Sequence, residues 1–408
     1  MTTGQPPRLS VIIPTYNRCG VLGQTLKSLT AQRFPADDFE VIVTDDGSSD
    51  GTAEMVRSFS GRLRLKYRFQ EDEGFRVTVA RNAGARLAEA PVLAFLDAGT
   101  LAGPDFVPGH LAAAAAGSGQ RAVIGYCFGY RLFGEMSWLT DALAELEPAQ
   151  VVQRYRHEPS FLDFRQGEFE KTGFDLRRLI APWNLFWSMN CSVSADAFWR
   201  AGGFDESFLS WGHEDLELGY RLFRGGAQFA LSQQAWSIEM PQQRPMVALR
   251  QSSSRNALRM LAKHCEPMVE LACAAHVRGE VFLIEGDGAV LRAWTRESAD
   301  LDVAAEIGAA AAGIPPGARV AIFGSGGVIP LSLAPAILLD FDASQLARAV
   351  AVGRHAGYQL VGLRTPLKAG SVEVVIITSR LSGLWDRWGT QVRAEARRIG
   401  KEVRTSLP

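Results

Sequence analysis

The sequence lacks the features that mark several classes of protein. Its five cysteines, Cys19, Cys127, Cys191, Cys265 and Cys273, are scattered and form no Cys-x-x-Cys pair. That spacing argues against a structural zinc site or a disulfide framework and favours the reducing cytoplasm as the location. No run reaches the roughly 18 apolar residues of a membrane span. The formal net charge is −1, so charge gives no reason to expect nucleic acid or an anionic membrane as a partner.

The composition that remains is that of a globular protein of more than one domain. Hydrophobic residues make up 47% of the 408 residues and charged residues 21%, which is enough apolar material for sizeable cores. A chain of this length is expected to form two or three domains.

The first quarter of the chain alternates short apolar runs with amphipathic segments. Strands are expected over Leu9–Pro14, Phe39–Thr44, Leu63–Phe69 and Pro91–Leu96, and helices over Cys19–Gln32, Ser49–Phe59 and Arg76–Ala88. This alternation predicts a parallel sheet that is covered by helices on both faces. Ligands of such sheets bind beyond the carboxyl ends of the strands.

Later segments divide the chain into two expected domains. Residues 118–182 have no clean period and are interpreted as loops and helices on the acceptor side. Short strands are expected at Asn190–Val193 and Gln228–Ser232, followed by a long helical stretch at Pro245–Cys273. Alternation restarts near Ala275, so we expect a first domain of residues 1–274 and a smaller Rossmann-like α/β domain of residues 275–408.

Four segments in order carry a specific resemblance. They are PTYNR at Pro14–Arg18, TDDGSSDGT at Thr44–Thr52, the segment Ala80–Gly99, and Gly202–Gly226 with its Trp-Gly-His-Glu-Asp sequence. Together they resemble the motifs of family 2 glycosyltransferases, and the fourth resembles the Trp-Gly-x-Glu-Asp segment of galactosyltransferases and chondroitin-polymerase-type enzymes. The resemblance implies an α/β domain of GT-A fold that binds a nucleoside-diphosphate sugar.

The resemblance also assigns roles on the donor side. Pro14, Thr15 and Tyr16, with Asp46, would recognise the nucleotide base, and Arg81 would face the base or the diphosphate. Two simpler interpretations stay open: Asp46 could be an Asx residue that stabilises its own turn, and Arg81 could be a surface arginine.

The metal-binding motif of the family is incomplete in this sequence. GT-A enzymes commonly hold Mn²⁺ or Mg²⁺ with an Asp-x-Asp motif, but this chain reads Asp97-Ala98-Gly99. Asp97 could still bind a divalent cation, or it could bind ribose instead. A metal site would need another ligand, and Glu239 could supply that oxygen. Arginines could instead take part of the diphosphate charge.

An inverting transfer needs a base for the acceptor hydroxyl. The resemblance makes Asp215 the base and places Glu214 against the donor sugar or the acceptor. Both residues begin a predicted helix, so either could simply cap it. Trp211 would stack on a sugar face or belong to the core. Residues expected on the sugar and acceptor side are Trp211, Gly212, His213 and Asn190.

The C-terminal unit resembles, more faintly, a class I methyltransferase core. Gly324–Gly327 follows one strand, and Asp340 ends the next, where an acid could bind ribose. The glycine signature is incomplete, so we favour a packing or dimerisation module without methyl transfer, and a homodimer is one possible assembly.

These observations predict a cytoplasmic, inverting glycosyltransferase that acts on a small-molecule or glycan acceptor. The abundance of alanine, arginine and glycine suggests a bacterial natural-product or glycan pathway. A nucleotide-sugar mutase or isomerase with the same donor site is the first alternative. A non-catalytic nucleotide-sugar-binding protein is the second.

Overall fold

The computed structural model describes residues 5–117, 119–131, 136–242, 245–280, 282–351 and 353–408. The chain forms two compact units, Met1–Asn256 and Ala257–Pro408. The boundary expected after residue 274 lies inside a helix of the second unit, and the two-domain limits of the sequence stay a prediction. None of the described helices is long and apolar enough to cross a membrane.

The first unit is built on one mixed sheet. Its described strands, in the order β3-β2-β1-β4-β7-β6-β8-β5, form a parallel half followed by a half of mixed direction. The strands are β1 (Leu9–Thr15), β2 (Phe39–Asp45), β3 (Leu65–Phe69), β4 (Val92–Leu96), β5 (Thr100–Ala102), β6 (Arg121–Phe128), β7 (Asn190–Ser194) and β8 (Gln228–Glu239).

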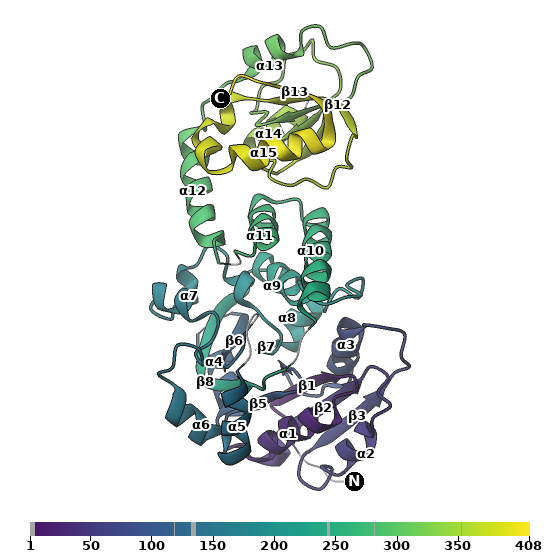
Figure 1. Cartoon of the computed structure of the whole chain (residues 1–408), viewed down its shortest axis with the longest axis vertical. Coiled ribbons are helices and arrows are strands. Elements are labelled where there is room, and N and C mark those ends of the chain that lie inside the picture. The colour runs from purple at the N-terminus through teal and green to yellow at the C-terminus, as the bar shows by residue number, and fades with distance from the viewer. Residues whose placement is uncertain (1–4, 118, 132–135, 243–244, 281, 352) are drawn as a thin grey trace. The chain divides into compact units, whose positions relative to one another are not determined.

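Helices pack on both faces of the parallel half, because alternate side chains of a strand point to opposite faces. Val11 and Ile13 of β1 pack with the apolar face of α1 (Cys19–Thr30). Ile12 points to the other face, beneath Gly84 of α3 (Val77–Leu87). A Cβ atom at Gly84 would lie 2.6 Å from Ile12 Cγ2, so glycine permits this close approach. Figure 1 shows α1 and α3 on opposite sides of the strands, as predicted from the alternation of strands with helices along the sequence.

The helices of this unit connect the strands and cover the sheet. They are α1 (Cys19–Thr30), α2 (Thr52–Arg57), α3 (Val77–Leu87), α4 (Phe106–Ala115), α5 (Ser137–Glu145), α6 (Pro148–Tyr155), α7 (Gln166–Lys171), α8 (Ala195–Arg200) and α9 (Glu214–Arg224), and α10 (Met246–Lys263) continues across the unit boundary.

Several elements differ from the prediction. The segment 118–182 contains β6, a buried strand in the middle of the sheet, as well as helices. The continuous parallel part of the sheet ends at β4, because β7 runs antiparallel to β4 and to β6, and only the pair β6 and β8 is parallel beyond it among the described strands. The stretch Pro245–Cys273, expected to be helical throughout, contains parts of two helices. Helix α10 ends at Lys263, and Pro267 begins α11. A proline at the first turn is compatible with a helix start but not with the interior.

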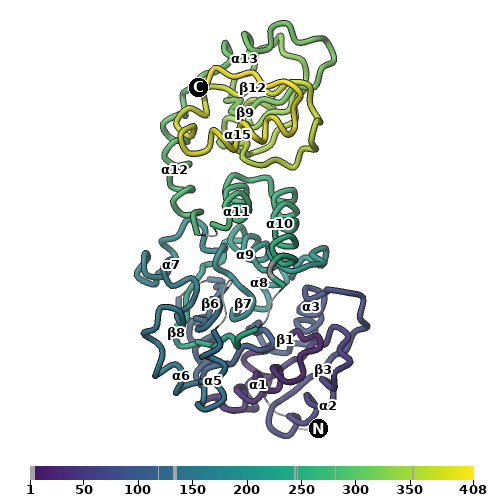
Figure 2. The backbone as a smooth tube through the Cα atoms, in the orientation of Figure 1, coloured from purple at the N-terminus to yellow at the C-terminus, as the bar shows by residue number. Residues whose placement is uncertain are grey.

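The second unit has an all-parallel sheet in the order β11-β10-β9-β12-β13. Its strands are β9 (Val320–Phe323), β10 (Ile337–Leu339), β11 (Ala356–Tyr358), β12 (Val372–Ile377) and β13 (Gly400–Thr405). Its helices are α11 (Pro267–Arg278), α12 (Ile284–Glu297), α13 (Ala304–Ala311), α14 (Ala343–Val350) and α15 (Trp385–Ile399). The tube in Figure 2 follows the chain through β9, β12 and α15. β13 follows α15 directly and pairs in parallel with β12.

Candidate active site

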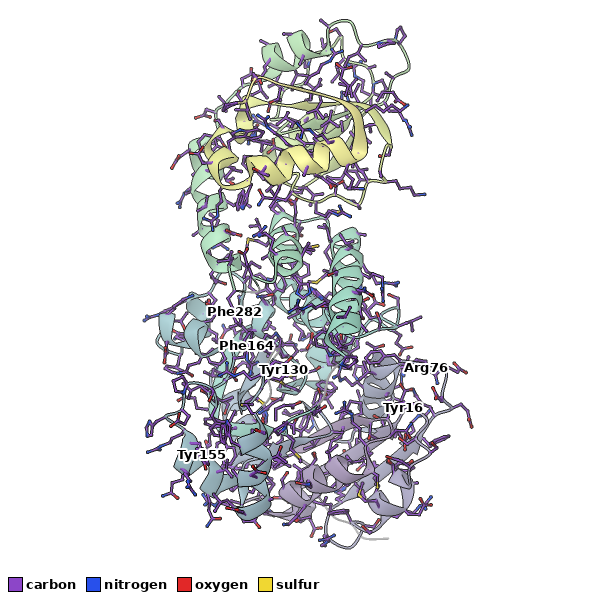
Figure 3. The ribbon with its side chains drawn as sticks, in the orientation of Figure 1. Tyr16, Arg76, Tyr130, Tyr155, Phe164 and Phe282 are labelled. Atoms are coloured by element: carbon purple, nitrogen blue, oxygen red, sulfur yellow. The ribbon has the colours of Figure 1, made fainter. Side chains whose placement is uncertain are left out.

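The carboxyl end of β1 presents one exposed aromatic side chain. Pro14 and Thr15 are buried, and the backbone N–H of Asp46 donates to the Thr15 carbonyl oxygen at 2.9 Å. Tyr16 is 46% exposed, and its hydroxyl donates to Asp72 Oδ2 at 2.8 Å. Tyr16 and Arg76 are both labelled in this region of Figure 3. The structure thus brings the three residues of the first motif close to Asp46, and their recognition of a nucleotide base stays a prediction.

The two aspartates after β2 have different environments. Asp45 accepts a hydrogen bond from the Ser48 N–H at 2.8 Å and one from the Tyr67 hydroxyl at 2.6 Å, so Asp45 holds the turn. Burial and the Asp45 carboxylate raise the pKa of Tyr67. Asp46 instead accepts from the backbone N–H of Arg76 at 2.9 Å. Asp46 therefore fixes the start of α3 rather than its own turn, and the Asx interpretation does not describe this conformation.

Arg81 lies inside the site rather than on its surface. Only 3% of this residue is exposed. Its Nη2 donates to Asp97 Oδ1 at 2.9 Å, and its Nη1 donates to Glu214 Oε1 at 3.2 Å. Burial opposes the charge, but Asp97 and then Glu214 raise the pKa of Arg81 above its usual value. Arg81 is therefore not a surface arginine, and its expected contact with the base or the diphosphate stays a prediction.

The carboxylate of Asp215 is oriented by two backbone N–H groups. Its Oδ2 accepts a hydrogen bond from the backbone N–H of Ser188 at 3.1 Å, and its Oδ1 accepts one from Leu216 at 2.8 Å. The residue is partly exposed, in contrast to the buried Glu214. Burial and the adjacent Glu214 carboxylate raise the pKa of Asp215 to about 7, and Arg81 opposes that shift.

Glu214 serves the loop that precedes it. Its Oε2 accepts the Gly212 N–H at 2.9 Å, while its Oε1 pairs with Arg81. Glu214 therefore joins the Trp-Gly-His-Glu-Asp loop to the donor side and does more than cap α9. His213 is buried at the N-cap position with a φ of 71°, a conformation that non-glycine residues adopt only where their surroundings impose it.

Helix α10 supplies those surroundings, which the sequence did not indicate. Asn256 Nδ2 donates to the carbonyl oxygens of Ser210 and Gly212, each at 2.8 Å. Ser252 Oγ donates to the Trp211 carbonyl oxygen at 2.7 Å, and Ser253 Oγ lies 3.1 Å from His213 Nδ1. Trp211 is partly exposed. The polar residues at 252, 253 and 256 are the sequence feature that could have indicated this contact with the loop. A search for apolar periodicity does not detect them, because it uses only the spacing of apolar residues.

The segment before β7 connects the donor and base sides. Ser188 donates its N–H to Asp215, and the next residue, Met189, accepts the N–H of Asp97 at 3.3 Å. Two adjacent backbone groups therefore fix both Asp97 and Asp215. No side-chain motif marks Ser188, so no pattern in the sequence points to this residue.

Asn190 belongs to the core. Its side chain is 0% exposed and lies 2.9 Å from His110 Nε2, and its Nδ2 donates to Ser237 Oγ at 2.8 Å. Burial lowers the pKa of His110 to about 4, with the Asn190 contact opposing the shift, so this histidine stays neutral. The side chain of Asn190 offers no surface to an acceptor, and we leave it out of the proposed site.

The residues around Asp97 would hold a cation through one carboxylate. The side chain of Asp97 is 38% exposed. Glu239 is buried and accepts from Thr100 Oγ1 and Gln242 Nε2, each at 2.7 Å. A Cβ atom at Gly99 would lie 3.2 Å from Gln242 Nε2, and the φ of 96° at this position favours glycine, so a second carboxylate here would require Gln242 to shift and the backbone to be strained. Over the described ranges, no three His, Cys, Asp or Glu residues gather as a metal site.

Arg18 lies at the same turn. Its Nη1 donates to Gln242 Oε1 and to the Ala98 carbonyl oxygen, the latter at 3.5 Å. Because Arg18 is exposed, its positive charge stands at the solvent side of the Asp97 turn. An anion that approaches Asp97 would therefore meet a guanidinium group as well.

Comparison with known proteins places this geometry in a family. Residues 10–169 match the family model for glycosyl transferase family 2. The chain is 42% identical to the validoxylamine A glucosyltransferase of Streptomyces hygroscopicus subsp. jinggangensis (strain 5008), over 98% of this chain and 97% of that protein. It is 35% identical to the chondroitin synthase of Escherichia coli, over 54% of this chain and 33% of that one.

A solved mannosyltransferase from Pyrobaculum calidifontis, in complex with GDP-Man and Mn²⁺, matches with a TM-score of 0.47 and 20% identity, over 75% of this chain and 80% of that one.

The Streptomyces relative matches both units rather than the four motifs alone. The predicted fold class, a GT-A-type α/β domain with a second, smaller α/β domain, is confirmed. The chain belongs to glycosyl transferase family 2 and is a glycosyltransferase.

Proposed function

We propose that the first unit transfers a sugar from a nucleoside diphosphate to an acceptor hydroxyl, with inversion and with Asp215 as the base. The observation that carries this proposal is the position of Asp215, which is partly exposed and oriented by the Ser188 N–H at 3.1 Å. Its pKa, raised to about 7, suits a group that accepts a proton near neutral pH.

In this mechanism Asp215 takes the hydroxyl proton while the acceptor oxygen attacks the anomeric carbon, and the nucleoside diphosphate leaves from the opposite face. Glu214 helps to hold Asp215 in place by accepting a hydrogen bond from the Gly212 N–H of the preceding loop. Thr15, Tyr16 and Asp46 form the nucleotide side. Trp211 is partly exposed and lies four residues before Asp215 in the chain, and it offers a flat surface to a sugar ring.

The leaving diphosphate requires positive charge. A divalent cation bound by Asp97 and the diphosphate itself would supply it, since Mg²⁺ needs only one or two carboxylates when substrate phosphates complete its shell. Arg18 would share that charge from the same turn. Glu239, whose oxygens already accept two hydrogen bonds, is not required.

The relative of 42% identity is named for glucosyl transfer to validoxylamine A, so a glucose donor with that acceptor is the first pair to assay. Cytoplasmic location, a bacterial natural-product pathway and a homodimer through the second unit stay predictions.

The two alternative functions predict different products. A mutase would convert the donor alone without releasing a nucleoside diphosphate. A binding protein would neither convert the donor nor release a nucleoside diphosphate.

The test compares wild type, Asp215→Asn and Asp215→Glu for nucleoside-diphosphate release, with and without acceptor. We expect acceptor-dependent release by wild type and loss of about 10²–10⁴-fold in Asp215→Asn, the usual contribution of a general base. NMR of the product assigns the anomer. An unimpaired Asp215→Asn, or retention of the donor anomeric configuration, would overturn the proposal.

A further inference from the structure

The second unit has the architecture of a nucleotide-binding domain. Its sheet is wholly parallel, with β9 between β10 and β12. In such sheets a ligand binds beyond the carboxyl ends of the central strands. Gly324–Gly327 follows β9, and Asp340 follows β10, so both features expected of an adenosyl cofactor site lie at this edge.

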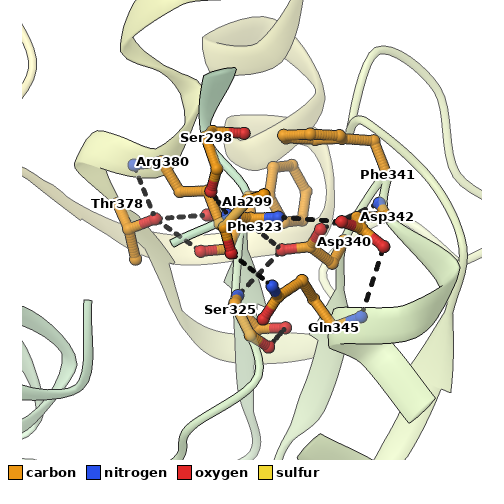
Figure 4. Close-up of polar contacts among 12 residues, drawn as sticks. Ser298, Ala299, Phe323, Ser325, Asp340, Phe341, Asp342, Gln345, Thr378 and Arg380 are labelled. Atoms are coloured by element: carbon orange, nitrogen blue, oxygen red, sulfur yellow. Dashed lines mark hydrogen bonds and ion pairs between the residues drawn. The ribbon is translucent and has the colours of Figure 1, made fainter. Parts of the chain in front are cut away.

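The acid of that site already has partners. Asp340 is 0% exposed, and its Oδ2 accepts the Arg380 Nε–H at 2.7 Å and the Gly326 N–H at 2.8 Å. Its Oδ1 accepts the backbone N–H of Asp342 at 2.9 Å. Figure 4 shows these contacts converging on Asp340. Ribose hydroxyls would have to displace a buried ion pair to reach this carboxylate.

The arginine fills the space next to the acid. Arg380 is 0% exposed, and its Nη1 donates to the Ser298 carbonyl oxygen. The guanidinium carbon lies 5.0 Å from the centre of the Phe341 ring. Nη2 has no hydrogen-bond partner among the described residues, although Asp342 Oδ2 is 3.7 Å away. The cation is therefore held by Asp340, Ser298 and Phe341 from within the unit.

The glycines of the loop approach protein atoms. A Cβ atom at Gly324 would lie 2.9 Å from Thr378 Oγ1 and 3.2 Å from Arg380 Cβ. A Cβ atom at Gly327 would collide with Gln345 Oε1. The φ of 73° at Gly324 favours glycine there, whereas Gly327 faces the mobile ends of side chains. At both positions the atoms that cover the loop belong to the same unit.

A second internal occupant lies after β11. The backbone N–H groups of residues 361–364 converge on Glu270 of α11, at 2.6 Å (Val361), 2.9 Å (Gly362), 2.6 Å (Leu363) and 3.0 Å (Arg364). Glu270 is 0% exposed. Successive N–H groups of this kind form an anion-binding concavity, and here a carboxylate of the same unit fills it.

We propose that the second unit is a cofactor-free derivative of a nucleotide-binding domain, in which Arg380 and Glu270 occupy the ligand positions permanently. Asp340 acts as the counter-ion of Arg380 and not as a ribose ligand. The unit therefore takes no adenosyl or dinucleotide cofactor. The inference rests on contacts within the second unit and is independent of the proposed sugar transfer.

The first experiment needs no variant. Calorimetric titration of the full chain with S-adenosylmethionine and with NAD⁺ is expected to give no saturable heat, and neither ligand should raise the unfolding temperature. Saturable binding of either ligand that Asp340→Asn abolishes would overturn the proposal.

The second experiment tests Arg380 as the occupant. Arg380→Ala leaves Asp340 buried without its cation, so the unfolding temperature should fall by roughly 10 °C. Guanidinium ion at about 10 mM should restore part of that loss in Arg380→Ala and have no such effect on wild type. Arg397→Ala, on the exposed side of α15, is the control and should match wild type. An unchanged unfolding temperature in Arg380→Ala would contradict the proposal.

Discussion

Arg81 joins two carboxylates that come from different motifs. It donates to Asp97 at 2.9 Å and to Glu214 at 3.2 Å while almost completely buried. Arg81→Met would leave Glu214 buried without its cation, and breaking a buried pair costs roughly 3–5 kcal/mol. Lysine cannot span both partners with one ammonium group, so Arg81→Lys should also lose stability. Urea unfolding measures both losses.

Arg86 on the same helix provides the matched control for Arg81. Its contact with Glu206, at 3.2 Å, is exposed on both sides, and such pairs contribute about 0–1 kcal/mol. Arg86→Met should therefore unfold close to wild type. Equal losses in Arg81→Met and Arg86→Met would mean that burial of the pair has no energetic consequence.

The pH dependence of transfer should report Asp215. A base must be ionised, and the pKa of Asp215 is raised to about 7, so kcat/KM should fall as pH decreases below about 7. Glu214→Gln removes a negative charge that raises this pKa, and the acid limb should move to lower pH. The measurement is a pH profile from pH 5 to 9. An unmoved limb in Glu214→Gln would show that another group controls it.

At the scale of the element, α10 holds the loop that carries the base. Asn256 donates to two carbonyl oxygens of the loop at 2.8 Å each. Asn256→Asp keeps the shape but turns a donor into an anion that faces those oxygens. We expect kcat to fall on the order of tenfold or more, because small misplacements of catalytic groups are costly.

Ser254→Ala is the control on the same helix, since Ser254 is only half buried and lies outside the three residues that bind the loop. Circular dichroism would confirm that each variant folds. If Asn256→Asp altered the KM for the donor but left kcat unchanged, α10 would not position the base.

Some elements could be predicted because their physical signal is local. The strands β1, β2 and β4 are continuous apolar runs that end in turn residues, and the structure contains them nearly as expected. β6 was missed because its flanking segments have no clear period, and its pairing with β7 and β8 is set by residues far away in the chain. Pairing of that kind leaves little trace in a single sequence.

The same contrast holds for the site. Asp97, Glu214 and Asp215 belong to sequence motifs and could be identified from them. Ser188 contributes a backbone N–H, and backbone groups carry no residue-type signal. Arg81 also belongs to a motif, but its burial depends on the tertiary position of Glu214, which its own helix does not encode.

At the scale of the whole molecule, the two units should respond differently to nucleotide. Both units have α/β sheets, but the residues at the carboxyl ends of their strands differ in burial. Tyr16 and Asp97 of the first unit are partly exposed, whereas Asp340 and Arg380 of the second are buried. A ligand stabilises the state and region that bind it. Hydrogen exchange with UDP, GDP or dTDP plus Mn²⁺ should therefore slow in peptides around residues 10–20, 44–52 and 97–102.

Peptides of the second unit around residues 320–342 and 358–366 should exchange at the same rate with and without nucleotide, since Arg380 and Glu270 already fill those positions. Asp97→Asn should weaken protection in the first unit when Mn²⁺ is present, whereas Glu239→Gln should have less effect on metal-dependent protection. Protection confined to the second unit would contradict two proposals: the donor site in the first unit, and the filling of the second unit's ligand positions by Arg380 and Glu270. Nucleotide would then bind where side chains of the protein now lie.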